Sequence, residues 1–175
     1  DSEDFLARVD LLSNLGERVL ITNFNHFYDL STYLRSFTSK KVAFCLGIYN
    51  LEEMLDETKY SGDSAGLLGA IGSLVGPQVH LLVYPATQAN QGKEQLQGII
   101  NSQNMTVPEN TRLIVQYLQK EGKLEDILDF NTDVTAIWSR TVLRMITNSE
   151  PGWEKMVPEL VSDIVKDKKL FGCKG

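Results

Sequence analysis

Hydrophobic and polar positions follow two different periods along the chain, and each period predicts its own kind of element. Apolar residues recur at helical spacing in seven segments, and short apolar runs without that spacing occur in three places. The predicted helices cover 3–15, 27–37, 51–55, 67–75, 108–121, 133–147 and 158–169. The predicted strands cover 18–22, 42–48 and 79–84. The strands are short, β-branched or uniformly apolar, which is typical of strands buried in a parallel sheet.

The order of these elements predicts the class of fold. Each predicted strand is followed by a helix, or by a loop leading to one, which indicates right-handed crossovers and a parallel sheet. We therefore predict an α/β fold: a small Rossmann-like, three-layer domain with a short parallel sheet and a helical C-terminal extension. We expect one domain over 1–175, with a β/α core at 1–84, a loop at 85–107 and the extension at 108–175.

The carboxyl ends of the predicted strands are where a ligand is expected, because open parallel sheets bind ligands outside those ends. Neutral hydrogen-bonding groups and two aromatic rings follow the three strands. These candidate ligand-binding residues are Asn23, Asn25, His26, Tyr49, Asn50, Tyr84 and Thr87. They suit a small polar ligand that is nucleotide-like or sugar-like. The alternative is that the asparagines cap helices and turns, and that the chain is a non-catalytic structural or interaction module.

Catalytic chemistry has few candidates in this sequence. His26 is the one plausible general acid or base in the predicted crevice, with Asn23 and Asn25 as orienting donors. No glycine-rich phosphate loop follows the first predicted strand, so a dinucleotide cofactor is not expected. Two histidines and two cysteines lie too far apart to show metal-ligand spacing, and no metal is expected. Whether the chain is an enzyme stays open at this stage.

Composition and charge narrow the classes of partner. The chain has 175 residues, with 17 Lys and Arg against 23 Asp and Glu, a net charge of −6. An acidic chain repels phosphates, so a nucleic-acid partner is not expected. Prolines interrupt the long uncharged stretch 64–92, so a membrane span is not expected either. Cys45 lies in an apolar run and is expected to be buried, and the sparse cysteines suit the cytoplasm or another reducing compartment.

Several short motifs, in order along nearly the whole chain, carry a resemblance to a known family. They include Val19–Phe24, Val83–Pro85, Trp153–Pro158 and Leu170–Gly172. The chain resembles the C-terminal portion of a bacterial family of larger proteins, labelled both as TonB-dependent receptor and as nicotinate-nucleotide adenylyltransferase. The His-x-Gly-His motif of the second label does not occur, and a soluble α/β chain does not fit the first.

The resemblance carries an expectation about the chain's extent. It implies a fragment of a longer protein, which agrees with a first residue, Asp1, that is not Met. Separately, Trp138 and Trp153 lie at the C-terminal helices, where they either pack in the core or form a docking surface for an upstream domain or a protein partner.

Overall fold

The computed structural model describes residues 2–62, 64–87 and 98–173, and it has a mixed α/β architecture. The chain divides into two compact units, which we name the sheet unit (Asn23–Ala136) and the helical unit (Asp1–Thr22 with Ile137–Gly175). The division departs from the predicted boundaries. Helix α5 (Glu109–Lys120) and strand β5 (Leu124–Asp126) belong to the sheet unit, so the all-helical C-terminal part starts at Ile137 rather than at 108.

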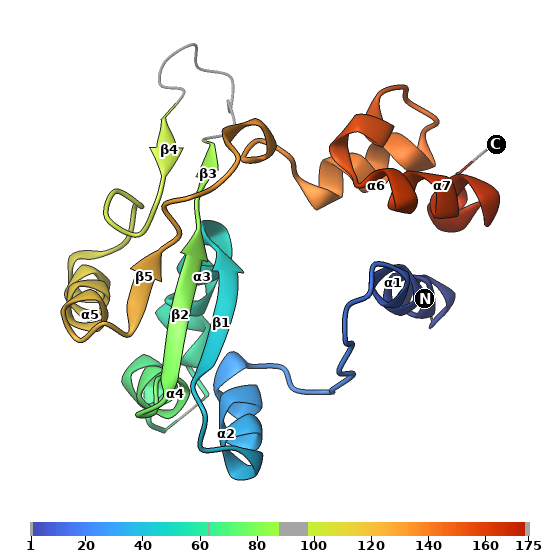
Figure 1. The fold of residues 1–175 in the computed structure, drawn as a ribbon. Helices are drawn as coiled ribbons and strands as arrows, with labels where there is room; N and C mark the ends of the chain where they lie inside the picture. Colours follow the sequence, from blue (N-terminus) through green and yellow to red (C-terminus); the bar gives the residue numbers. More distant parts are fainter. Residues whose placement is uncertain (1, 63, 88–97, 174–175) are drawn as a thin grey trace. The chain divides into compact units, whose positions relative to one another are not determined.

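A small parallel sheet with the strand order β1-β2-β5 organises the sheet unit (Figure 1). Strand β1 (Val42–Gly47) pairs with β2 (Val79–Tyr84), and Val42 lies opposite Val79. Strand β2 in turn pairs with β5, and Leu81 lies opposite Leu124. The bounds of β1 and β2 agree within one residue with the predicted strands 42–48 and 79–84, and the parallel pairing of these two strands is confirmed.

The predicted strand 18–22 is wrong, and β5 takes its place as the third strand. Residues 18–22 have no regular structure, and Leu20 and Ile21 are 60% and 56% exposed. A β-branched run forms a strand only where it can pair with a neighbouring strand and pack against other side chains, since β-propensity depends on context. The segment ends in Thr22, where the helical unit's N-terminal part ends.

Helices cover one face of this sheet. Alternate strand residues such as Leu46, Leu81 and Leu124 enter a core with α3 (Ile48–Met54), α4 (Gly66–Leu74) and α5. In Figure 1, α3 lies behind β1 and β2. On the opposite face Ala43 and Cys45 are exposed, so Cys45 is not the buried residue that its apolar run predicted.

The strand order explains why the predicted three-layer arrangement is not confirmed. Both crossovers step in the same direction across the sheet, from β1 to β2 and from β2 to β5. Right-handed crossovers that step in one direction place all their helices on one face. A layer on the second face requires a reversal of direction, as in doubly wound sheets, and the three described strands contain none.

The remaining elements of the sheet unit extend from this frame. Helix α2 (Phe27–Phe37) packs against α4, and the 3₁₀ helix η1 (Glu57–Tyr60) precedes α4. Strands β3 (Ala86–Thr87) and β4 (Ile99–Ile100) pair antiparallel within the predicted loop 85–107. The middle of that loop, 88–97, lies outside the described residues. A short 3₁₀ turn, η2 (Thr132–Val134), completes the unit.

The helical unit has its own core. Helix α1 (Ser2–Asn14) contributes Leu11, α6 (Ser139–Thr147) contributes Val142 and Ile146, and α7 (Glu159–Asp167) contributes Val165. The 3₁₀ helices η3 (Trp153–Met156) and η4 (Leu170–Gly172) follow α6 and α7. Within the described part of the chain, no helix combines the length and apolarity that crossing a membrane requires.

Candidate functional site

Two of the predicted strand ends meet at one edge of the sheet. Gly47, the last residue of β1, lies opposite Tyr84, the last residue of β2. Tyr49 and Asn50 follow in the first turn of α3, which starts at Ile48, so Asn50 lies inside this helix and is not its N-cap. Burial raises the pKa of the Tyr49 phenol, and the nearby Glu52 carboxylate raises it further.

Side chains of the same unit contact the end of β2. The Tyr84 ring meets the Phe130 ring edge to face, with centroids 6.0 Å apart. Next along the chain, the Thr87 hydroxyl lies 2.5 Å from the Thr135 hydroxyl, and the Thr87 amide donates to the Thr135 carbonyl at 3.1 Å. The predicted residues Tyr84 and Thr87 therefore hold the segment that follows β5, which is a structural role. A binding role for them stays a prediction.

The structure adds a residue to this edge that the sequence pattern did not indicate. Asp126 ends β5 and accepts two hydrogen bonds from the buried Ser102, from its amide at 3.0 Å and from its hydroxyl at 2.8 Å. The Gln119 amide donates to the same hydroxyl at 2.6 Å. A strand of three residues that contains two acids has no apolar run, and so no periodic signal marked it.

The other predicted residues lie elsewhere. Asn23 and Asn25 are exposed and follow an irregular segment rather than a strand. His26 is half-buried and immediately precedes α2 in an extended conformation, where its side chain makes no capping hydrogen bond. His26 therefore does not follow a strand end, because the predicted strand 18–22 does not form.

A pocket forms around His26 within the sheet unit. The pocket measures about 550 Å³. Its lining combines aromatic rings, an ammonium group, a hydroxyl and a glycine: His26, Tyr28, Lys59, Tyr60, Gly62 and Ser64. The His26 ring stacks on Tyr28, with centroids 5.1 Å apart and planes 6° from parallel, and it lies 5.9 Å from the Tyr60 ring.

Hydrogen bonds and ion pairs fix the far wall of this His26 pocket. The buried Tyr60 hydroxyl donates to the Met54 carbonyl at 2.8 Å. Burial raises the pKa of this phenol, and the neighbouring Tyr28 and Asp56 raise it further. Lys59 forms an ion pair with Glu53, and Asp56 caps η1 by accepting from the Thr58 amide. The wall is therefore built from α3 and η1, while His26 and Tyr28 supply the facing rings.

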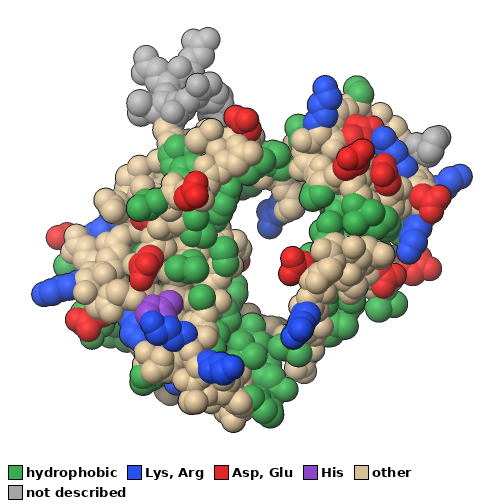
Figure 2. Space-filling view, in the orientation of Figure 1, with side chains coloured by type: hydrophobic (Ala, Val, Ile, Leu, Met, Phe, Trp, Pro, Cys, Tyr) green, Lys and Arg blue, Asp and Glu red, His purple; other side chains and the backbone are tan. Residues whose placement is uncertain are grey.

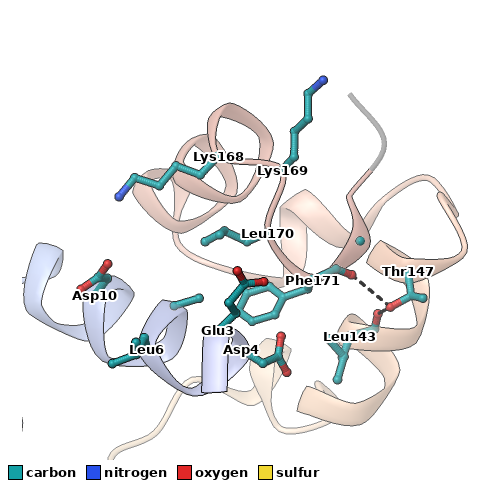
Figure 3. Close-up of a pocket in the computed structure, with 12 residues that line it drawn as sticks. Glu3, Asp4, Leu6, Asp10, Leu143, Thr147, Lys168, Lys169, Leu170 and Phe171 are labelled. Carbon is teal, nitrogen blue, oxygen red and sulfur yellow. Dashed lines mark hydrogen bonds between the residues drawn. The ribbon is translucent and has the colours of Figure 1, made fainter. Parts of the chain in front are cut away.

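A second cavity, of about 670 Å³, lies in the helical unit between α1 and η4 (Figure 3). Its wall carries Glu3 and Asp4 from α1 and Leu170 and Phe171 from η4. In Figure 3 the Lys168 and Lys169 side chains point away from this space. The Thr147 hydroxyl lies 2.9 Å from the Leu143 carbonyl and 3.2 Å from the Phe171 carbonyl, so its one proton is shared between α6 and η4.

Potential metal ligands in the described ranges are the side chains of His, Cys, Asp and Glu. No group of three or more His, Cys, Asp or Glu side chains comes together there. The two histidines lie apart: His80 bonds through Nδ1 to the Gly122 carbonyl at 2.9 Å, whereas His26 lines its pocket. No protein-family model, curated protein or solved structure matches the chain, so the resemblance to a bacterial family stays a prediction.

Proposed function

We propose that the sheet unit binds a small polar ligand, nucleoside-like or sugar-like, in the His26 pocket. The observation that carries the proposal is the stacked pair of His26 and Tyr28 beside Tyr60, at the edge of a cavity of about 550 Å³. Aromatic side chains with a few polar groups are the usual lining of small-molecule sites. A volume of that order lies within the range of such sites.

The polar groups of the pocket favour hydroxyl-rich ligands. Ser64 and Lys59 are exposed at the rim, where a hydroxyl and an ammonium group offer hydrogen bonds to ring oxygens or a ribose. His26 supplies a ring nitrogen, and as a general acid or base it would serve any reaction at this site. The Tyr60 hydroxyl is engaged by Met54, so Tyr60 offers the ligand its ring.

The proposal moves the ligand from the predicted strand ends to a pocket between α2 and η1. Asn23, Asn25, Tyr49, Asn50, Tyr84 and Thr87 are not among its lining residues. The Rossmann-like, three-layer fold, with its ligand site at the strand ends, would need helices on the sheet face where Ala43 and Cys45 are exposed. That arrangement stays the alternative to the present proposal.

A thermal-shift panel tests the binding proposal. Adenosine, uridine, AMP, glucose and N-acetylglucosamine are each added to the full chain at millimolar concentration. A ligand at 100 times its Kd stabilises by about 2.7 kcal/mol, which raises Tm by several degrees. His26→Ala should abolish that rise, and His80→Ala, the same change outside the pocket, should retain it. A flat panel, or a rise that His26→Ala leaves intact, refutes the proposal.

One observation favours a second function, that of an interaction module. The helical unit has an apolar groove of about 560 Å³, which the buried Leu11, Val142 and Trp153 line together with Leu12 and Leu15, 46% and 38% exposed. Exposed apolar surface of this kind marks interaction sites. Leu12→Asp should then abolish co-purification of a partner protein without changing the far-UV circular dichroism spectrum.

A further inference from the structure

Strand β1 presents a free backbone edge. It is the outer strand in the order β1-β2-β5. The Val42 amide donates to the Gln78 carbonyl at 2.8 Å, on the β2 side. Because backbone groups of alternate residues point to opposite sides of a strand, the amides and carbonyls of Ala43 and Cys45 point outward. Among the described residues, no recorded hydrogen bond from another segment meets these outward groups.

The edge lacks the devices that normally prevent strand pairing. Edge strands are commonly protected by charged residues, prolines or bulges. Strand β1 reads Val-Ala-Phe-Cys-Leu-Gly, six residues without a charge or a proline, and it pairs with β2 in unbroken register. Both Ala43 and Cys45 are exposed. The strand is therefore an open template for another strand.

One exposed aromatic side chain of α2 contacts β1, and two further exposed rings follow it along the helix. The Phe27 ring lies 6.2 Å from the ring of Phe44 in β1, and Phe27 is 39% exposed. Tyr33 and Phe37, with ring centroids 4.9 Å apart, are 41% and 74% exposed. Figure 2 shows hydrophobic side chains gathered over α2 and over the sheet face turned to the viewer. Large exposed apolar surface beside a free strand edge is characteristic of a protein interface.

We propose that β1 pairs antiparallel with β1 of a second copy of this chain, joining two three-stranded sheets into one across a two-fold axis. The charges at the two ends of β1 select this partner and direction. Lys40 and Lys41 precede the strand, and Glu52 follows it in α3. Antiparallel pairing brings the lysines of one copy toward the end of the strand that Glu52 of the other copy follows, whereas parallel pairing would bring lysines together. A two-fold contact of this kind closes on itself.

Cys45 reports on this arrangement because it lies near the centre of β1. In a pairing centred on Cys45 or on Phe44, the two Cys45 side chains lie opposite each other or on the diagonal, with Cβ atoms within about 8 Å. A short bis-maleimide spans either separation. The experiment uses the full chain with Cys173→Ser, so that Cys45 is the one reactive thiol.

The dimer is tested by light scattering after size exclusion and by crosslinking. We expect twice the 19.6 kDa mass of the chain and a crosslinked band that Cys45→Ser removes. Ala43→Lys places an ammonium at the edge and should raise the dimer dissociation constant at least tenfold. Gln116→Lys, the same charge change at an exposed position of α5, should leave it unchanged. Circular dichroism verifies that both variants fold.

Two results would overturn the dimer. One is a monomeric mass at 100 µM or more without a Cys45 crosslink. The other is a dimer that forms no crosslink through Cys45 and survives Ala43→Lys, because it must then use another surface. The crosslink is read in a chain with unaltered β1, so the outcome stands even if Ala43→Lys fails to fold. The result is independent of ligand binding at the His26 pocket.

Discussion

Two glycines of α4 should respond differently to the same substitution by alanine, because only one of them has room for a Cβ atom. Gly72 is exposed in the last turn of the helix, and an added Cβ would meet nothing within 4 Å. Alanine loses less conformational entropy in a helix than glycine, which is worth about 1 kcal/mol. Gly72→Ala should therefore raise the free energy of unfolding by about 1 kcal/mol.

At Gly69, alanine would bring the same gain in helix propensity as at Gly72, but the surroundings of Gly69 differ. A Cβ added there would overlap the Cβ of Ala65, closer than real Cβ atoms approach. Forcing an extra carbon into a packed site costs about 1–3 kcal/mol. Subtracting the gain of about 1 kcal/mol leaves Gly69→Ala neutral to about 2 kcal/mol destabilising.

Urea titration followed by far-UV circular dichroism measures both variants against the parent chain. The double variant Ala65→Gly with Gly69→Ala removes the overlapping Cβ, so it should recover stability relative to its Ala65→Gly parent. The reasoning fails if Gly69→Ala stabilises as much as Gly72→Ala, or if Ala65→Gly gives no recovery. Either result would mean that packing against Ala65 does not require glycine at position 69.

Two other predictions concern buried hydrogen bonds. Ser102→Ala removes the hydroxyl that joins Asp126 and Gln119, so it should lower the free energy of unfolding by about 2 kcal/mol, measured by urea titration. The control Gln103→Ala, at an exposed position, should lower it by less than about 0.5 kcal/mol. Equal effects of the two variants would contradict a structural role of this hydrogen-bond network. Tyr60 has a raised pKa in the folded state, so its contribution to stability is complete below about pH 10 and is lost as the pH rises further. Tyr60→Phe should lower stability at pH 7 by about 1 kcal/mol and reduce the alkaline loss, whereas Tyr117→Phe, 63% exposed, should change neither.

Strong periodicity allowed most elements to be predicted from the sequence. The helices α2 and α5 were predicted within about one residue at each end, and α1, α4 and α7 within two. Their stripes of apolar residues recur at helical spacing, and Gly16 and Gly122, both with positive φ, end their segments. The predicted helix 133–147 is divided into η2 and α6, because a periodic pattern does not reveal a break in the backbone.

Predictions failed where a local pattern depended on a distant partner. Residues 18–22 have the composition of a strand without a neighbour to pair with, whereas Leu124–Asp126 is a strand because β2 offers its free side. The Ile127 amide extends that pairing by donating to the Val83 carbonyl at 2.9 Å. Pairing between segments 40 residues apart is a property of the fold, and single-segment propensity does not encode it.

The candidate site could be predicted only in part for the same reason. His26 was identified as the one available acid or base, and it lines a pocket. Its neighbours Lys59, Tyr60 and Ser64 were not foreseen, since they come from η1 and the turn after it rather than from strand ends. Spacing along the chain gives no sign that residues 26 and 60 meet; the packing of α2 against α4 brings them together.

The direction of the crossovers connects the fold, the site and the free edge. A ligand crevice at strand ends arises where neighbouring connections leave the sheet toward opposite faces. Here both crossovers step from β1 toward β5, so their helices lie on one face of the sheet. In the described sheet, no two neighbouring connections leave toward opposite faces, and the usual crevice at the strand ends is therefore not formed. The His26 pocket lies instead beside the start of α2 and η1. The same one-way winding places β1 at the outer edge, with Ala43 and Cys45 uncovered. The strand order therefore leaves β1 without a neighbour on its outer side in the described sheet, and the proposed dimer would extend the sheet from that side.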